Sequence, residues 1–76
     1  MNATRRETLD KAVALLEEAT SLIDGAAEEE RAAYDNLPEG LQEAERGQRM
    51  DEAATELEEA SSTIDDVISQ VEGAKE

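Results

Sequence analysis

The chain has 76 residues, of which 21 are acidic and seven basic, and its formal net charge is −14. It contains no Cys and no His, which excludes disulfides, thiolate chemistry, zinc sites built from these residues and imidazole acid–base catalysis. With no Phe, no Trp and one Tyr, it lacks the aromatic area that fills a multilayered core, so we expect one small domain of long helices.

The first expected element is a helix over residues 4–36. Thr4 and Glu7 fit a capping box, in which the hydroxyl and the carboxylate each accept a hydrogen bond from a free amide at the start of the helix. The main apolar stripe follows the alternating spacing of four and three that marks one helix face: Leu9, Val13, Leu16, Thr20, Ile23, Ala27 and Tyr34. A second apolar row makes the stripe wider than a two-helix contact requires: Ala12, Leu15, Ala19, Leu22 and Ala26.

A connector over residues 37–46 follows the first helix. We expect Asn36 and Pro38 to end the helix, because a proline disfavours the helical conformation in the residue before it. Pro38 can then open a short helical turn that runs to Gln42. Gly47 falls opposite Tyr34 when the chain folds back, and we expect it to leave room for the tyrosine ring.

The connector and the residues beside it contain more residue types with specific chemistry than a turn between two helices requires. They hold the only Tyr, the only Pro and three of the five Arg. Tyr and Arg often dominate protein interfaces, so one interpretation is a recognition surface at the tip of the hairpin, formed by Arg31, Tyr34, Asn36, Leu37, Arg46 and Arg49. The other interpretation is structural, with Tyr34 and Leu37 plugging the end of a helical bundle.

The centre of the chain also resembles the central block of a family of small, acidic, uncharacterised proteins from phages, prophages and mobile elements. The resemblance is carried by Tyr34-Asp35-Asn36-Leu37-Pro38-Glu39-Gly40-Leu41-Gln42, followed by Glu45-Arg46-Gly47 and Met50. It covers about a quarter of the chain. The family brings no established activity; the resemblance implies a mobile-element origin and a helical-hairpin shape.

The second expected helix covers residues 47–73 and largely repeats the first. Residues 9–24 and 50–65 align with nine identities in sixteen positions. Thr20 and Ser61 are equivalent in this alignment; their hydroxyls either fix the register between helices or bond to their own helix. The second stripe comprises Met50, Ala54, Leu57, Ser61, Ile64, Ile68 and Val71, and it is widened by Ala53, Ala60, Val67 and Ala74.

Connector length sets the direction of the second helix. Each helix is about 40 Å long and the connector reaches at most ~35 Å, so the helices run antiparallel. The expected fold is all-α: an antiparallel two-helix hairpin that folds back about residue 41 or 42. One hairpin buries a single stripe per helix, which falls short of the ordering cost of about 1.5 kcal/mol per residue. We therefore expect a homodimer in which two hairpins form a four-helix bundle, with completion by another protein as the alternative.

No motif in the chain indicates catalysis or metal binding. Adjacent acids diverge by about 100° on a helix, and no His completes the Glu-x-x-His motif of di-metal bundles. Residues 35–40 lack the ligand spacing of a calcium loop, and no glycine-rich phosphate cradle is present. We expect no enzymatic activity, no metal and no cofactor.

The net charge and hydropathy limit the partners and the compartment. Nucleic acids and anionic membranes both reward positive charge, so we expect neither as a direct partner. No apolar run approaches the ~20 residues of a membrane span, and no apolar block follows the basic start as it would in a secretory signal. We therefore expect a cytoplasmic protein in the host cell.

Three functional hypotheses remain. The leading one is a non-enzymatic protein–protein interaction module that binds an unknown protein partner through its tip. The first alternative is an inhibitor of a DNA-binding or defence protein that mimics nucleic-acid phosphates with an acidic face comprising Glu17, Glu18, Glu58 and Glu59. The second alternative is a binder of small anionic ligands at the bundle end, through Arg31, Tyr34, Arg46 and Arg49 of two subunits.

Overall fold

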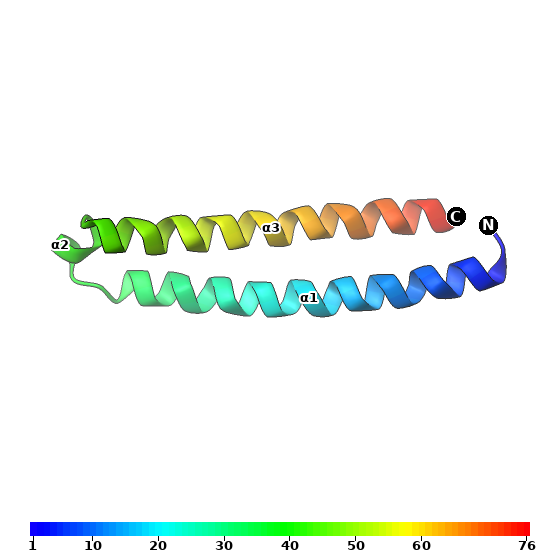
Figure 1. Cartoon of the computed structure of the whole chain (residues 1–76), viewed down its shortest axis with the longest axis horizontal. Coiled ribbons are helices and arrows are strands. Elements are labelled where there is room, and N and C mark those ends of the chain that lie inside the picture. The colour runs from blue at the N-terminus through cyan, green and yellow to red at the C-terminus, as the bar shows by residue number, and fades with distance from the viewer.

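The computed structural model describes all residues from Met1 to Glu76 and contains helices only. Two long helices, α1 (Ala3–Asp35) and α3 (Glu45–Lys75), lie side by side and are joined by the four-residue helix α2 (Glu39–Gln42). The chain ends meet at one end of a rod whose Cα extents are 58 × 15 × 12 Å, and α2 caps the other end (Figure 1). The expected antiparallel helical hairpin is confirmed.

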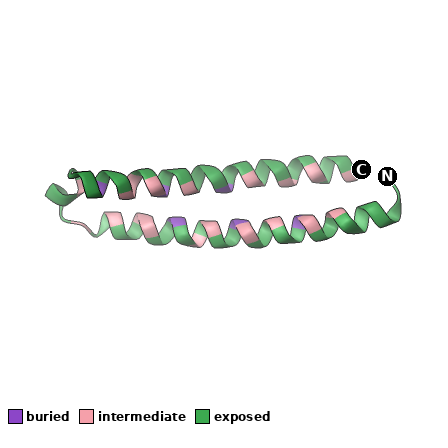
Figure 2. Ribbon diagram, in the orientation of Figure 1, coloured by how far each residue is buried: buried purple, intermediate pink, exposed green.

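The two expected stripes form the seam between the long helices. Every residue assigned to either stripe is buried or half-buried, and the outward surfaces of both helices are exposed (Figure 2). The deepest positions recur every seven residues, which is the repeat of two helices wound along a common seam. They are Val13, Thr20 and Ala27 on α1, and Gly47, Ala54 and Ser61 on α3.

The register of the seam can be followed through polar contacts near its two ends. Arg6 Nε donates to the carbonyl oxygen of Lys75 at 3.1 Å, and Arg31 contacts Asp51 near the tip. Residues whose numbers add to about 82 therefore lie level with each other, which agrees with a chain that folds back about residue 41.

The start of α1 differs from the expected one. The helix begins at Ala3, and Asn2 is its N-cap: Asn2 Oδ1 accepts a hydrogen bond from the backbone amide of Arg5 at 2.8 Å. The expected capping box at Thr4 and Glu7 is wrong, because Thr4 already lies inside the helix. Asn is at least as good an N-cap as Thr, so the helix can begin one residue earlier, with Asn2 as its cap.

The other helix ends lie within two residues of the expected positions. Asn36 caps α1 after Asp35, and its amide donates to the carbonyl of Ala32 at 3.0 Å. Helix α3 is longer than expected by two residues at each end, since it begins at Glu45 and runs to Lys75. Neither long helix has a stretch apolar enough to cross a membrane.

The core of the single chain is thin. Six of the 76 residues are buried, and no large side chain is fully buried. The second apolar row of α1 is left largely in water, since Leu15 is 66% exposed and Leu22 is 71% exposed. The hairpin thus covers the main stripe of each helix and leaves most of the widening residues exposed.

Candidate interaction surfaces

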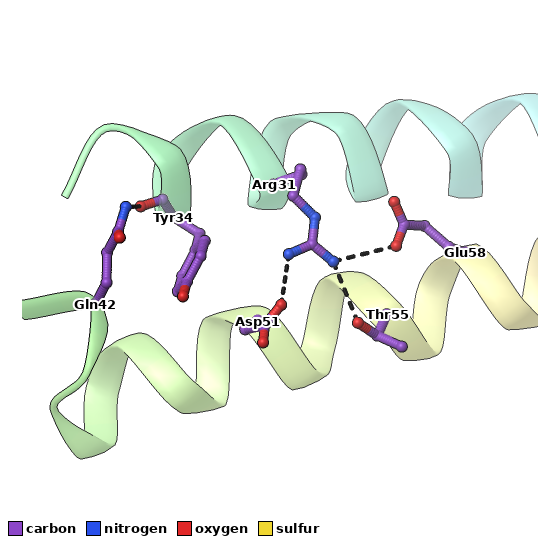
Figure 3. Close-up of polar contacts among 6 residues, drawn as sticks. All are labelled: Arg31, Tyr34, Gln42, Asp51, Thr55 and Glu58. Atoms are coloured by element: carbon purple, nitrogen blue, oxygen red, sulfur yellow. Dashed lines mark hydrogen bonds and ion pairs between the residues drawn. The ribbon is translucent and has the colours of Figure 1, made fainter. Parts of the chain in front are cut away.

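Arg31 ties the two long helices together beside the seam (Figure 3). Its Nη1 donates to Asp51, while its Nη2 lies 3.2 Å from both Thr55 Oγ1 and Glu58 Oε1. The hydrogen bonds to Asp51 and then to Glu58 raise the pKa of Arg31, because both carboxylates favour the charged guanidinium. The structure thus places Arg31 in a contact between helices, and not on the outer surface of the tip.

Tyr34 lies between this contact and the corner. The Cζ atom of Arg31 is 5.9 Å from the centroid of the Tyr34 ring, within the range of a cation–π contact. The carbonyl oxygen of Tyr34 accepts a hydrogen bond from Gln42 Nε2 at 3.1 Å (Figure 3). It also accepts one from the amide of Leu37 at 3.0 Å. The end of α1 and the end of α2 are therefore held together through the Tyr34 carbonyl.

Gly47 allows α2 to pack directly against the first turn of α3. A Cβ atom at this position would lie 2.7 Å from the Cα of Gln42 and still closer to the carbonyl oxygens of Leu41 and Gln42. The expectation that Gly47 makes room for the Tyr34 ring is therefore wrong about the neighbour, since backbone atoms of α2 are the nearest atoms. The sequence correctly predicted that another part of the chain approaches Gly47 closely. Which part does so depends on the path of the connector, which places α2 there.

A compact set of residues remains accessible around this corner. Asn36, Leu41, Arg46 and Arg49 are exposed, while Tyr34 and Leu37 are half-buried. Leu41 is 54% exposed and is not among the tip residues predicted from the sequence. The sequence did indicate it, because Leu41 is a leucine that belongs to neither apolar stripe. We call this set the tip surface: Tyr34, Asn36, Leu37, Leu41, Arg46 and Arg49.

Some acidic residues pair with cations across the seam, whereas others are exposed and unpaired. Asp10, Asp51 and Glu58 lie beside the seam and pair with cations, Asp10 with Lys75 and the other two with Arg31. Of the four residues proposed as a phosphate-mimicking face, Glu58 is therefore already paired with Arg31. Glu17, Glu18 and Glu59 are exposed, and we call these three the free acidic face.

Neither a pocket nor a cluster of acids placed to hold a metal ion is found in the single chain. The candidate sites are therefore outer surfaces of the rod, and their chemistry is that of hydrogen bonding, charge and apolar contact.

No family model matches the chain. No curated protein and no solved structure matches it either.

Proposed function

We propose that the protein is a non-enzymatic interaction module that binds another protein through the tip surface. The observation that carries this proposal is the construction of the corner. The Gln42–Tyr34 hydrogen bond and the contact of α2 with Gly47 fix its backbone, yet Leu41, Arg46 and Arg49 stay exposed. A backbone that is already fixed before binding loses less entropy on association than a flexible one does.

The chemistry of the tip surface differs from that of the rest of the rod. Arg46 and Arg49 carry two of the seven positive charges of a chain whose net charge is −14. The nearest acid to Arg49 is Glu45 at 3.9 Å, in a pair whose side chains are 70% and 85% exposed. Such a pair is weak in water, so both guanidinium groups are free to bind carboxylates of a partner, with Leu41 as an apolar anchor.

In this proposal the module acts as a homodimer, with two hairpins in a four-helix bundle, in the cytoplasm of a host cell. The thin core of the single chain supports the dimer, because pairing would cover the exposed leucines of α1. The resemblance of residues 34–50 to proteins of phages and mobile elements supports a mobile-element origin. An enzymatic role is not proposed.

The test is a pull-down from host lysate with the tagged protein and a tip variant, Leu41→Ser/Arg46→Gln/Arg49→Gln. Arg31 is left intact, because its loss would disturb the contact between helices. The control is Lys11→Gln, which removes an exposed positive charge on α1 far from the tip. We expect the tip variant to lose a partner that the control retains. Equal capture by both variants would overturn the proposal.

A second candidate function is inhibition by phosphate mimicry, and the free acidic face favours it. The variant Glu17→Gln/Glu18→Gln/Glu59→Gln removes three exposed charges and leaves the Arg31 contacts in place. If mimicry is correct, this variant loses its partner, and the wild-type complex dissociates in moderate salt because its contacts are mainly ionic. A partner that binds this variant as well as the wild type excludes mimicry.

A further inference from the structure

One flank of α1 carries an apolar row that the hairpin covers only in part: Ala12 and Ala19 are half-buried, while Leu15, Leu22 and Ala26 are exposed. It lies beside the main stripe and has the same alternating spacing of three and four. We call it the leucine flank: Ala12, Leu15, Ala19, Leu22 and Ala26. Ala53 and Ala60 of α3 extend it, because they directly precede the deepest positions Ala54 and Ser61, as Ala12, Ala19 and Ala26 do on α1, and so lie on the same side of an antiparallel pair. Val67 continues this row one heptad further along α3.

The opposite flank of the hairpin has the reverse character. Arg31, Asp51 and Glu58 lie four residues after the deepest positions, and their ion pairs cross the seam on that side. On the leucine flank, the α1 stretch from Ala12 to Ala26 has no charged residue, whereas α3 carries one, Glu56, at the position equivalent to Leu15. A second copy with a charge of −14 meets less repulsion at close range along this uncharged stretch of α1 than along the acidic flank.

The internal repeat shows that the two leucines are not needed inside the hairpin. Leu15 corresponds to Glu56 and Leu22 corresponds to Thr63 in the alignment of the two arms. Both positions of α3 are exposed, and α3 packs into the same seam as α1 does. Because a polar residue serves equally well in the equivalent position, the leucines of α1 must act outside the single chain.

We propose that the leucine flank is the homodimer interface, and that the α1 helices of two copies pack on each other in opposite directions. Ala19 is the middle residue of Ala3–Asp35, and Leu15 and Leu22 lie on either side of it. A two-fold axis at Ala19 places Leu15 against the partner's Leu22 and overlaps the two rods along their whole length. This inference rests on the homodimer in the proposed function and gives it a surface and an orientation.

Area and charge both fit this arrangement. The broad face of the rod measures 58 by 15 Å, so full overlap would bury on the order of 800 Å² of each copy, which is the share of each partner in an interface of standard size. The first charged residues beyond the leucine flank are Glu29 at one end and Arg5 at the other, both on the same helix face. Antiparallel pairing brings Glu29 of one copy within about a turn of the partner's Arg5.

Cysteine cross-linking tests the orientation, because the chain has no cysteine of its own. Ala19→Cys lies on the proposed axis, so we expect it to form a disulfide-linked dimer. Ala12→Cys should form none alone, but it should form one when mixed and refolded with Ala26→Cys. The control is Ala14→Cys, an exposed position on another face of α1, which should not cross-link. Self-linkage of Ala12→Cys, or a failure of Ala19→Cys to link, would overturn the antiparallel arrangement.

Sedimentation equilibrium tests the surface independently of the tip. The variant Leu15→Glu/Leu22→Thr gives α1 the residues that α3 carries at the equivalent positions. We expect it to raise the dimer dissociation constant at least about 100-fold, since four leucines leave the interface. At protein concentrations above the dissociation constant of the variant, its helix content by circular dichroism should equal that of the wild type. The control Ala14→Glu/Ser21→Thr should dimerise as the wild type does. A wild-type protein that stays monomeric at high micromolar concentration would overturn the interface but leave tip binding open, because the pull-down reports that separately.

Discussion

The hydroxyl of Thr20 lies in the middle of the seam, where the side chain is buried and Oγ1 has no hydrogen-bond partner. Two other threonines behave differently: Thr8 and Thr63 donate to the carbonyl oxygens of Thr4 and Glu59, at 3.1 and 3.0 Å. Neither of the two roles expected from the sequence for the Thr20 hydroxyl is therefore fulfilled within the single chain. A buried hydroxyl without a partner destabilises the folded state.

Replacement of Thr20 by Val should therefore stabilise the hairpin. The shape is kept and an unpaired polar group is removed, so the free energy of unfolding should rise by about 1 kcal/mol. The control is Thr63→Val, which removes an exposed hydroxyl that is already bonded to its own helix and should change stability little. Urea denaturation measures both variants. A loss of stability in Thr20→Val would show that this hydroxyl has a partner in the assembled protein.

Glycine substitutions should have opposite effects at two positions. Gly25 has open space where a Cβ would lie, so Gly25→Ala should stabilise α1 by about 0.5–1 kcal/mol through helix propensity. Gly47→Ala gains the same propensity, but its Cβ would collide with the backbone of Leu41 and Gln42. We expect Gly47→Ala to destabilise the protein and displace α2, as read by thermal melts and by amide chemical shifts of residues 39–42. Equal stabilisation by both substitutions would contradict the close packing of α2.

At the scale of the helices, the ends of the hairpin are held by cations placed between acids. At the open end, Lys75 contacts Asp10 on α1 and Glu72 on its own helix, the latter at 3.2 Å. The hydrogen bond to Asp10, followed by that to Glu72, raises the pKa of Lys75. Arg31 has the equivalent role near the corner, so a cation that pairs with acids across the seam lies near each end of the hairpin.

The Lys75 bridge predicts a loss of stability at alkaline pH. Because its pKa is higher in the folded state, its contribution is complete below the unfolded pKa of about 10.4 and is lost as the pH rises through the folded value. We expect the Tm to fall as the pH rises above the unfolded pKa of Lys75, and to fall less in Lys75→Met. The control Lys11→Met alters an exposed lysine and should keep the wild-type pH dependence. Identical pH profiles for Lys75→Met and the wild type would show that the bridge does not contribute.

For the whole molecule, the dominant feature is a net charge of −14 on a thin rod. Repulsion among the exposed acids opposes both folding and dimerisation, and it acts over a longer range than the few ion pairs do. The proposed antiparallel dimer also places the two tip surfaces at opposite ends, about the 58 Å length of the rod apart. One dimer could then bind two partner molecules at once.

Salt should therefore stabilise this protein, although it weakens individual ion pairs. An increase from about 20 mM to about 500 mM NaCl shortens the Debye length from roughly 20 Å to roughly 4 Å, which screens repulsion between the acidic surfaces. We expect the Tm to rise and the dimer dissociation constant to fall, as measured by thermal melts and sedimentation at each concentration. A Tm that falls with salt would mean that the bridges of Arg31 and Lys75 outweigh the net repulsion.

The sequence by itself determined the two helices, their stripes and their antiparallel direction. These follow from helical periodicity and from a connector too short to span a rod, and both are local or geometric constraints that neighbours do not alter. The corner was predicted in outline for the same reason, because Pro38 restricts the backbone on either side of it.

Only the tertiary structure decided which side chains meet. Arg31 was expected at the tip, but its long side chain reaches the acids of α3, a choice set by the rotation of each helix about its axis. The path of the connector brings the backbone of α2 onto Gly47, whereas the exposure of Leu15 and Leu22 was already expected from the width of the apolar stripe. Periodicity fixes the angle of a residue on its own helix, whereas contacts depend on how two helices are turned towards each other.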